Sequence, residues 1–380
     1  MQLASILLVV TSAAVFYILI GYPLLLVMFG RTGASPVAKD LRFETTVSAI
    51  LAVYNGGAFI RAKLESLLAL DYPKDLLEII VVSDGSIDET ETVVNEFSDR
   101  VLLLSVPRGG KAAAINHALR RASGKIVFFT DVRQPLDRSA LRHLVANFAD
   151  PRVGAVSGEM QLLEPELGEQ ADMDLYWRYE VWARKRHSSI DSVFNATGCI
   201  YAMRRELAAP LPPDTLTDDA VLPLRAFFKG YRVVLDPEAI AFDYPAVANT
   251  EFRRRLRTLA GLWQVHARMP QLFTAHNRMR FHFLSHKFSR LVLPWAALLI
   301  LASTVALPPS PFRTFLLLDE LALILLAFLD CIVPGRSFLK RLSSPARTFV
   351  MMNAAALAAV SVFFLPATRL WLPTRVREGR

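Results

Sequence analysis

EIIVVSDGSIDET, residues 78–90, joins an apolar, β-branched run to a polar turn and then to two acids. Ile79–Val82 predicts a buried strand that ends at Ser83-Asp84-Gly85-Ser86. Asp88 and Glu89 favour a helix start, because acids at that position complement the positive end of the helix dipole. The stretch therefore predicts a strand, a polar turn and a helix in succession.

The same alternation continues on both sides of this stretch. Strands are predicted at 46–53, 101–106 and 126–130, and helices at 59–70 and 111–121. Such alternation is typical of a mostly parallel, doubly wound sheet, whose ligands bind beyond the carboxyl ends of the strands. The Tyr54-Asn55-Gly56 turn, Asp84 and Asp131 all follow predicted strands, so we expect them on one rim.

Composition separates this middle region from the two ends of the chain. Of the 380 residues, 53% are hydrophobic, and the excess lies in the first thirty residues and toward the C-terminus. The net charge of +8 suits nucleic acid, anionic lipid or a phosphorylated substrate, and the long apolar segments favour lipid. Cys199 and Cys331 fit neither a disulfide framework nor a metal site, and we expect free thiols.

The N-terminal segment has the length of a membrane span. Residues 1–30 carry no charge, and 6–28 exceeds the roughly 20 residues that a helix needs to cross a bilayer. A cleaved signal peptide is the alternative, but it has a basic region before a shorter apolar run. Arg31, Lys39 and Arg42 follow the segment, so the positive-inside rule predicts an outside N-terminus and a cytoplasmic middle domain.

Three further candidate spans lie near the C-terminus, at 291–307, 315–333 and 348–365. The second is the weakest, because acids inside a membrane are costly and it contains Asp319, Glu320 and Asp330. The segment with Arg336, Lys340, Arg341 and Arg347 predicts a cytoplasmic loop, and the basic tail with Arg369, Arg375, Arg377 and Arg380 predicts a cytoplasmic end. Three full spans cannot satisfy both, so we predict two or three C-terminal helices.

Three polar features at strand ends are candidates for ligand contact. Asp84 suits a uracil or ribose hydrogen bond, or an Asx turn that caps the next helix. Gly109-Gly110-Lys111 opens a helix and suits a diphosphate, because glycines allow close approach and helix N–H groups favour anions; a surface turn is the alternative. Asp131 suits a divalent ion that bridges a sugar diphosphate, or is an ordinary strand-end acid.

Two charged features follow in the second half of the domain. Thr217-Asp218-Asp219 opens a helix that runs toward Phe228, with Gly230 as its expected cap. These acids suit helix capping, or supply the one base that an inverting displacement at an anomeric carbon needs. Arg253, Arg254, Arg255 and Arg257 form a basic helix face that suits lipid headgroups or phosphate, and Arg253 and His286-Lys287 are expected to seat the domain on the bilayer.

Seven motifs together resemble the membrane-bound family 2 glycosyltransferases, the branch with cellulose, hyaluronan and poly-N-acetylglucosamine synthases. They are VSAILAVYNGG, EIIVVSDGSIDET, GGKAAAINHAL, KIVFFTDVRQ, NATGCIYAMRR, TDDAVLPLR and RRRLRTLAGLWQ, in this order between about residues 45 and 264. The resemblance implies a GT-A-like α/β domain together with transmembrane helices, and a sugar-transferring enzyme.

The resemblance also implies roles for single residues. Val53, Tyr54 and Asp84 would contact the nucleotide, and Lys111 its phosphates. Asp131 would be the first acid of the metal-associated DxD motif. Thr197 and Gly198 would shape the acceptor site. Asp219 matches the base that ends the family's TED sequence, with Asp218 beside it, and Arg257 matches the arginine of QxxRW near the diphosphate.

The chain departs from the family pattern at three places. Arg133 replaces the second acid of DxD, so a metal is held by Asp131 and phosphate alone, or Arg133 replaces part of its charge. Asp218 replaces the Glu of TED. Arg254 and Thr258 replace the Gln and Trp of QxxRW, which argues against processive polymer synthesis.

These observations predict an inverting glycosyltransferase that moves a sugar from a nucleotide sugar, UDP-linked by resemblance, to a glycan or lipid-linked acceptor in cell-surface or extracellular polysaccharide synthesis. The alternatives are a processive synthase and a non-catalytic nucleotide-sugar-binding subunit. We expect Mg²⁺ or Mn²⁺ as cofactor, the bilayer and subunits of a biosynthetic complex as partners, and no nucleic acid. The expected location is the cell membrane, multi-pass, with the catalytic domain in the cytoplasm.

The predicted domain organisation follows the composition. It comprises an N-terminal span at 1–30, the catalytic domain at 43–245, amphipathic interfacial helices at 249–288, C-terminal spans at 289–366 and a basic tail at 367–380.

Overall fold

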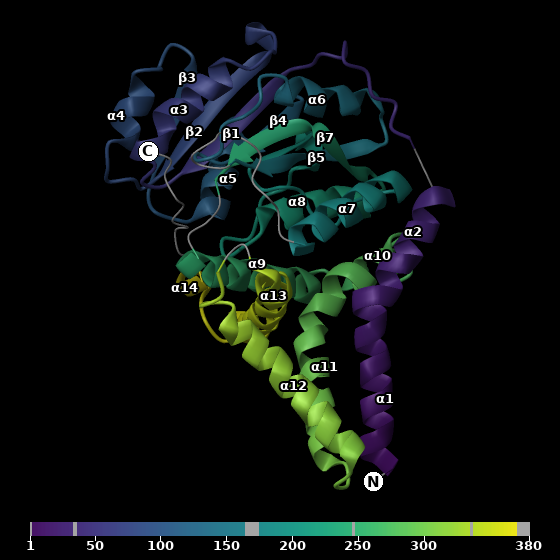
Figure 1. Cartoon of the computed structure of the whole chain (residues 1–380). Helices are drawn as coiled ribbons and strands as arrows, with labels where there is room; N and C mark the ends of the chain where they lie inside the picture. Colours follow the sequence, from purple (N-terminus) through teal and green to yellow (C-terminus); the bar gives the residue numbers. More distant parts are fainter. Residues whose placement is uncertain (1, 33–35, 164–174, 245–247, 335–336, 371–380) are drawn as a thin grey trace. The chain divides into compact units, whose positions relative to one another are not determined.

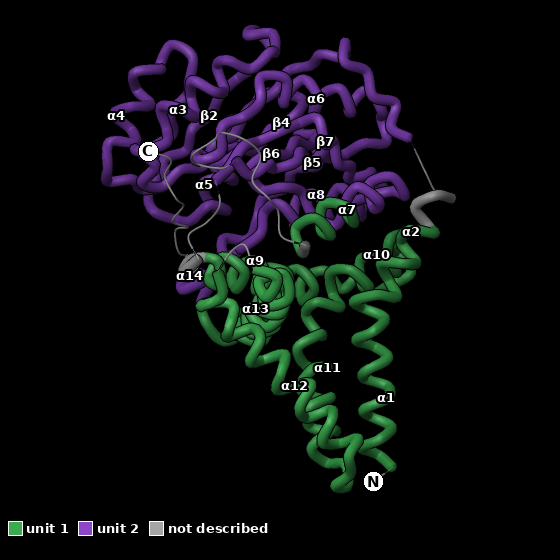
Figure 2. The backbone as a smooth tube through the Cα atoms, viewed as in Figure 1, with its two compact units in different colours: residues 1–32, 173–183, 248–365 green, residues 33–172, 184–247, 366–380 purple. Residues whose placement is uncertain are grey.

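The computed structural model describes residues 2–32, 36–163, 175–244, 248–334 and 337–370 (Figure 1). The chain divides into two compact units (Figure 2). The first, here the helical unit, comprises residues 1–32, 173–183 and 248–365. The second, here the sheet unit, comprises residues 33–172, 184–247 and 366–380.

The sheet unit is built on one seven-stranded sheet in the order β3-β2-β1-β4-β6-β5-β7. Its strands are β1 (Val47–Val53), β2 (Leu77–Asp84), β3 (Val101–Val106), β4 (Ile126–Thr130), β5 (Val153–Leu162), β6 (Ile200–Arg204) and β7 (Arg232–Asp243). All neighbouring strands pair in parallel except β6, which runs antiparallel to β4 and to β5. The predicted mostly parallel sheet is confirmed, with one reversed strand inside it.

Helices cover both faces of this sheet. They are α3 (Gly57–Leu68), α4 (Thr90–Asn95), α5 (Lys111–Arg121), α6 (Ala140–Ala146) and α8 (Asp218–Phe228). Alternate β1 residues such as Ala49 and Leu51 join a buried core with side chains of α3, α4 and α6. Ile50 faces α5 on the opposite side of the sheet. The Tyr201 hydroxyl on β6 donates to Asp218 at the start of α8, which places α8 on the same side as α5. β1 therefore lies between two helical layers, which explains its continuous apolar sequence.

The helical unit contains α1 (Gln2–Phe16), α2 (Tyr22–Thr32), α9 (Ala248–Arg268), α10 (Arg280–Phe283), α11 (Ser289–Ala306), α12 (Pro311–Leu329) and α13 (Phe338–Ala358). The remaining helices are α7 (Leu175–Ile190), which begins in this unit and ends in the sheet unit, and α14 (Ala367–Leu370). In Figure 1, α1 and α11 run side by side, and α11 and α12 form a hairpin.

Three helical segments of the described chain are long and apolar enough to cross a membrane: Gln2–Met28, Arg280–Ala306 and Phe338–Phe363. They include the predicted N-terminal span and two C-terminal ones. α12 is not among them, because it carries Arg313, Asp319 and Glu320. This result agrees with the prediction that the second C-terminal segment is the weakest candidate for a membrane span.

The basic segment before the last span is helical, so the predicted loop at Lys340, Arg341 and Arg347 is wrong. α13 begins at Phe338, where the Ser337 hydroxyl accepts a hydrogen bond from the Lys340 backbone N–H. The buried Asp330 carboxylate then draws Lys340 Nζ and Arg347 Nη1 to 3.0 Å each, and accepts from Ser343 Oγ at 2.7 Å. Arg336, Arg375, Arg377 and Arg380 lie outside the described residues.

A second correction concerns His286 and Lys287. Both side chains are buried within the helical unit, and Lys287 Nζ donates to the Glu180 carboxylate on α7. Arg290 Nη1 donates to the same carboxylate at 2.5 Å. The prediction that His286 and Lys287 contact lipid headgroups is wrong, because both side chains are buried inside the unit, where the partly buried Glu180 carboxylate binds Lys287 and Arg290.

Candidate active site

The predicted polar residues share one rim of the sheet. Tyr54 follows β1, Asp84 ends β2 and Asp131 follows β4. β1 lies between the other two strands, and its register pairs Val53 with Ser83 and Leu51 with Thr130. The three carboxyl ends are therefore adjacent, as parallel pairing requires.

Asp84 holds the loop that leads into α5. Its buried carboxylate accepts hydrogen bonds from the backbone N–H groups of Gly109 at 2.7 Å and Gly110 at 2.9 Å, and from the Arg108 guanidinium. Gly85 makes this approach possible: its φ is +69°, and a Cβ there would lie 2.9 Å from the Arg108 backbone N. The alternative that Asp84 caps the next helix is wrong, since it binds a loop more than twenty residues away.

Tyr54 and Arg108 form a stacked pair beside the Asp84 carboxylate. The Arg108 guanidinium carbon lies 3.7 Å from the centroid of the Tyr54 ring, and the tyrosine side chain is exposed. Val53, in contrast, is buried in the core below the rim. Of the three predicted nucleotide contacts, Tyr54 and Asp84 therefore present polar or aromatic groups at the rim, and Val53 supports them from beneath.

Lys111 connects two of the predicted acidic positions. It begins α5 after Gly110, whose φ of +88° directs the chain into the helix. Lys111 Nζ lies 2.9 Å from Asp131 Oδ1 and 3.1 Å from Asp218 Oδ1. Although burial opposes the charge, these two carboxylates raise the Lys111 pKa above its ordinary value. The ammonium group thus stays charged between the strand end and the start of α8.

Asp218 and Asp219 begin α8 but have different surroundings. Asp218 is buried and accepts a 2.9 Å hydrogen bond from the Tyr201 hydroxyl in addition to the contact with Lys111. Burial, followed by repulsion from Asp218, raises the pKa of Asp219 to about 7. A carboxylate with this pKa exchanges protons near neutral pH, as a general base must.

Gly198 and Thr197 lie beside this acid. A Cβ on Gly198 would lie 3.4 Å from Asp219 Oδ2, so the absence of a side chain leaves one side of the carboxylate uncovered. Thr197 Oγ1 donates to the Gly158 carbonyl at 2.7 Å and accepts from Arg184 Nη1 at 2.9 Å. The structure thus brings Thr197, Gly198 and Asp219 together, and the role of Thr197 and Gly198 at an acceptor site stays a prediction.

Sequence reasoning missed Arg184 and Tyr201. Arg184 on α7 also donates to Ser157 Oγ at 2.7 Å, and its charge lowers the pKa of Asp219 against the effect of burial. Tyr201 lies in the quoted motif NATGCIYAMRR, where strand alternation could have placed it on the opposite face from Ile200. Arg184 lies in none of the motifs, so only the fold reveals it.

Arg133, which stands at the second acid position of the DxD motif, binds Asp243. Its Nε and Nη2 atoms donate to the buried Asp243 carboxylate at 3.1 and 2.7 Å, and Gln134 Nε2 donates to the same group at 2.8 Å. Because Asp243 at the end of β7 balances the charge of Arg133, the idea that Arg133 replaces cation charge loses support.

A buried lysine holds the same turn from the other side. Lys63 on α3 is 1% exposed, and its Nζ donates to Thr130 Oγ1 at 2.7 Å and to the Gln134 carbonyl at 2.6 Å. Burial lowers the Lys63 pKa to about 7. The turn that carries Asp131 is therefore fixed by Lys63 and by Asp243.

One further cluster, His143, Asp236 and Glu238, has metal-ligand geometry. The Lys39 ammonium already lies among these side chains, 2.9 Å from Asp236, 2.6 Å from Glu238 and 3.2 Å from His143 Nδ1. The cluster contains none of the residues at the rim, and we assign it to an ion-pair network in the fold.

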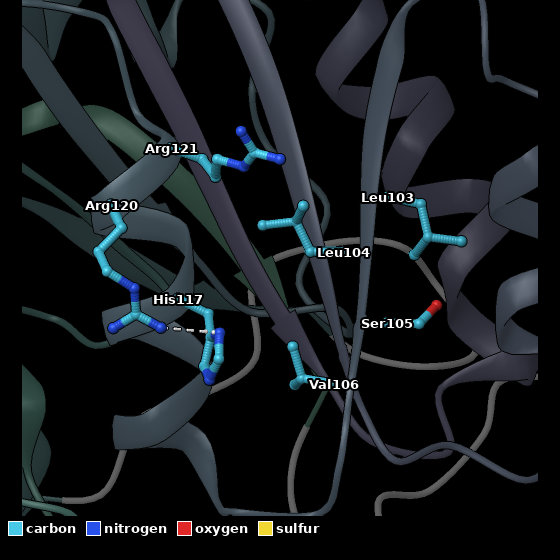
Figure 3. Close-up of a pocket in the computed structure, with 7 residues that line it drawn as sticks. All are labelled: Leu103, Leu104, Ser105, Val106, His117, Arg120 and Arg121. Carbon is cyan, nitrogen blue, oxygen red and sulfur yellow. Dashed lines mark hydrogen bonds between the residues drawn. The ribbon is translucent and has the colours of Figure 1, made fainter.

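One predicted site residue, Arg257, belongs to the helical unit, and one pocket lies elsewhere in the sheet unit. Arg257 is on α9 in the helical unit, so its predicted diphosphate contact stays a prediction. The pocket in Figure 3 lies between edge strand β3 and the second half of α5, where Arg120 donates to His117 Nδ1. Its lining contains none of the predicted site residues.

A mixed sheet of this order, with acids at the strand ends and at the start of α8, defines a GT-A-like transferase domain. Residues 48–210 match the model named Glycosyl transferase family 2. This part of the chain is therefore similar to a family 2 glycosyltransferase domain.

Known proteins agree with this assignment. A probable glycosyltransferase of Bacillus subtilis is 27% identical over 59% of this chain and 56% of its own length. A poly-β-1,6-N-acetyl-D-glucosamine synthase of Staphylococcus aureus is 25% identical over 59% of this chain and 54% of its own. The chain thus spans about half the length of these curated relatives. A mannosyltransferase of Pyrobaculum calidifontis, solved with GDP-Man and Mn²⁺, superposes with a TM-score of 0.78 at 25% identity, over 95% of this chain and 99% of that one.

Proposed function

We propose that this protein is a glycosyltransferase, which moves a sugar, with inversion, from a nucleotide-sugar donor to a glycan or lipid-linked acceptor at the membrane. The observation that carries the proposal is the Lys111 bridge between Asp131 and Asp218, with Asp219 beside it. This bridge combines a cation for a diphosphate with a base of suitable pKa. A non-catalytic binding subunit would need no such base.

In the proposed reaction, Asp219 accepts the proton of the acceptor hydroxyl. The acceptor oxygen attacks the anomeric carbon from the face opposite the nucleoside diphosphate, whose bond to that carbon breaks. Lys111 and the N–H groups at the start of α5 stabilise the negative charge of the leaving diphosphate. The pKa of about 7 lets Asp219 take the proton near neutral pH.

The residues at the rim suit a divalent cation. Mg²⁺ commonly binds through one or two carboxylates together with substrate phosphates and water. Asp131 offers a 38% exposed carboxylate at the strand end, and the Mn²⁺ in the Pyrobaculum mannosyltransferase supports the same cofactor class. When bound at Asp131, such a cation would neutralise part of the charge that develops on the diphosphate.

Two observations support short or single additions over polymer export. A secreting synthase needs a polar path through its membrane helices, and Asp319, Glu320 and Asp330 are the obvious polar candidates for it. Glu320 instead accepts a hydrogen bond from Thr304 on α11, and Asp330 is held by Lys340, Arg347 and Ser343. These acids join helices to one another within the helical unit.

The donor sugar is best identified by a direct screen. Purified protein in lipid nanodiscs with Mn²⁺ would be given UDP-N-acetylglucosamine, UDP-glucose or GDP-mannose, and release of the nucleoside diphosphate measured. We expect release from one donor, UDP-linked by resemblance, and a loss of about 10²–10⁴-fold in Asp219→Asn, the usual contribution of a general base.

The exposed acid Asp99 provides the matched control, because Asp99→Asn makes the same chemical change away from the rim. This variant should keep wild-type activity. If the wild-type protein neither binds nor cleaves any of the three donors, the proposed function is wrong.

A further inference from the structure

Arg108 makes two contacts at the rim, one with Tyr54 and one with Asp84. Its guanidinium is stacked 3.7 Å from the centroid of the Tyr54 ring, and it donates to Asp84 Oδ2. The Arg108 side chain is 44% exposed, whereas Asp84 is only 3% exposed. A partly exposed cation therefore covers a buried acid.

These two contacts are the ones that a nucleobase would make at the proposed donor site. A base is planar, stacks on an aromatic ring and donates ring or amino N–H groups to a carboxylate. The guanidinium has the same shape and the same donors. Asp84 already accepts from Gly109 and Gly110, and Arg108 occupies a further acceptor position on Oδ2 that a base N–H group could use.

We propose that Arg108 is an internal competitor for the nucleobase, which donor binding must displace from Tyr54 and Asp84. The proposal rests on the proposed function, because it needs a nucleotide at this rim. It makes Arg108 a residue that sets donor affinity.

The Arg108 contacts are weak enough to be displaced. The guanidinium is nearly half exposed, and neither a cation–π contact nor an ion pair of such a group is strong in water. If Arg108 covers the site for most of the time, the apparent affinity falls by the fraction of molecules in which the site is open. Removing the side chain should therefore tighten nucleobase binding by about 3- to 10-fold.

The test uses full-length protein in nanodiscs with Mn²⁺, titrated calorimetrically with UDP, GDP, uridine and guanosine. The variants are Arg108→Ala, Arg108→Met, which keeps much of the side-chain length without charge, and Arg100→Ala as the matched control. Arg100 is exposed and precedes β3, whereas Arg108 follows the other end of that strand. Thermal melting of each variant verifies folding.

We expect Arg108→Ala and Arg108→Met to bind the favoured nucleotide and its nucleoside more tightly, with Arg100→Ala unchanged. Equal affinity in all proteins overturns the inference. Weaker UDP or GDP binding with unchanged nucleoside binding also overturns it, since Arg108 then contacts phosphate. If the wild-type protein itself binds no nucleotide, the proposed donor site is wrong. This outcome can be told apart from failure of the Arg108 inference, in which the wild-type protein binds nucleotide but the Arg108 variants do not bind it more tightly.

Discussion

Burial and a neighbouring charge give Asp219 a pKa that suits a general base. Asp218 keeps two stabilising partners, Lys111 and Tyr201, while burial and the charge of Asp218 act on Asp219. Two consecutive acids thereby acquire different roles. Asp218 orders the site, and Asp219 is left with a pKa of about 7.

The raised pKa predicts a pH dependence of activity. Asp219 must be deprotonated to accept the acceptor proton, so kcat/KM should rise with pH and level off above about pH 7. Initial rates of diphosphate release between pH 5 and 9 measure this. A flat profile across this range, with binding of the donor unchanged, would contradict the assignment of Asp219 as the base.

The same pKa predicts a pH dependence of stability. Because the folded-state pKa lies above the unfolded value, folding is penalised once the unfolded acid ionises near pH 4, and the full penalty is present above about pH 7. Asp219→Asn should therefore melt at a higher temperature than wild type at pH 8, and the difference should shrink as pH falls toward 4. Melting curves at both pH values test the sign.

At the scale of elements, the turn after β4 gives a structural reason for a departure from the DxD motif, the arginine at position 133. Arg133 holds the end of β7 through Asp243, and Lys63 from α3 holds Thr130 and Gln134. Arg133, which replaces the second acid of DxD, thus joins this turn to β7, and Lys63 joins it to α3.

Arg133→Asp should consequently fail to restore a metal motif. The new acid would face Asp243 without its cationic partner, and an unpaired buried charge is strongly destabilising. We expect a loss of about 2–4 kcal/mol in the free energy of unfolding and no gain in apparent Mn²⁺ affinity.

Chemical denaturation and the Mn²⁺ dependence of diphosphate release measure these two quantities. Arg133→Lys is the control, because it keeps the charge near Asp243 and should lose less stability. Tighter Mn²⁺ binding in Arg133→Asp would show that the turn accepts a second ligand after all.

At the scale of the molecule, the helical unit suggests how the basic segments share one side of a membrane. The N-terminus of α1 and the α11–α12 connection lie at the same end of this unit (Figure 1). We propose that α1, α11 and α12 cross the bilayer and that α13 packs against α9 at the cytoplasmic surface, although α13 rather than α12 has the composition of a membrane span. Two C-terminal crossings then leave both Lys340 and Arg369 inside, which three crossings could not do.

Reporter insertions test this arrangement. A reporter at residues 308–309, between α11 and α12, should face the outside, and one at 334–335, between α12 and α13, should face the cytoplasm. Both predictions follow from α12 crossing despite Asp319 and Glu320. A cytoplasmic reporter at 308–309 would exclude the α11–α12 hairpin as a pair of spans.

Local patterns in the sequence determined much of the sheet unit. The strands at 101–106 and 126–130 and the helix at 111–121 begin and end where the sequence predicted, because apolar periodicity and glycine turns are local properties. The order of motifs likewise brought Tyr54, Asp84 and Asp131 to one rim, since parallel strands place their carboxyl ends together.

Only the tertiary structure decided which charges meet. Arg133 finds Asp243 at 110 residues' separation in sequence, and Lys63 finds the turn after β4 across 71 residues. Lys340 and Arg347 find Asp330 because a helix forms where a loop was expected. Charge pairing depends on distances between residues remote in sequence and on their burial. Local sequence patterns therefore determined the strands and helices of the sheet unit, and the fold determined the electrostatics of its candidate site.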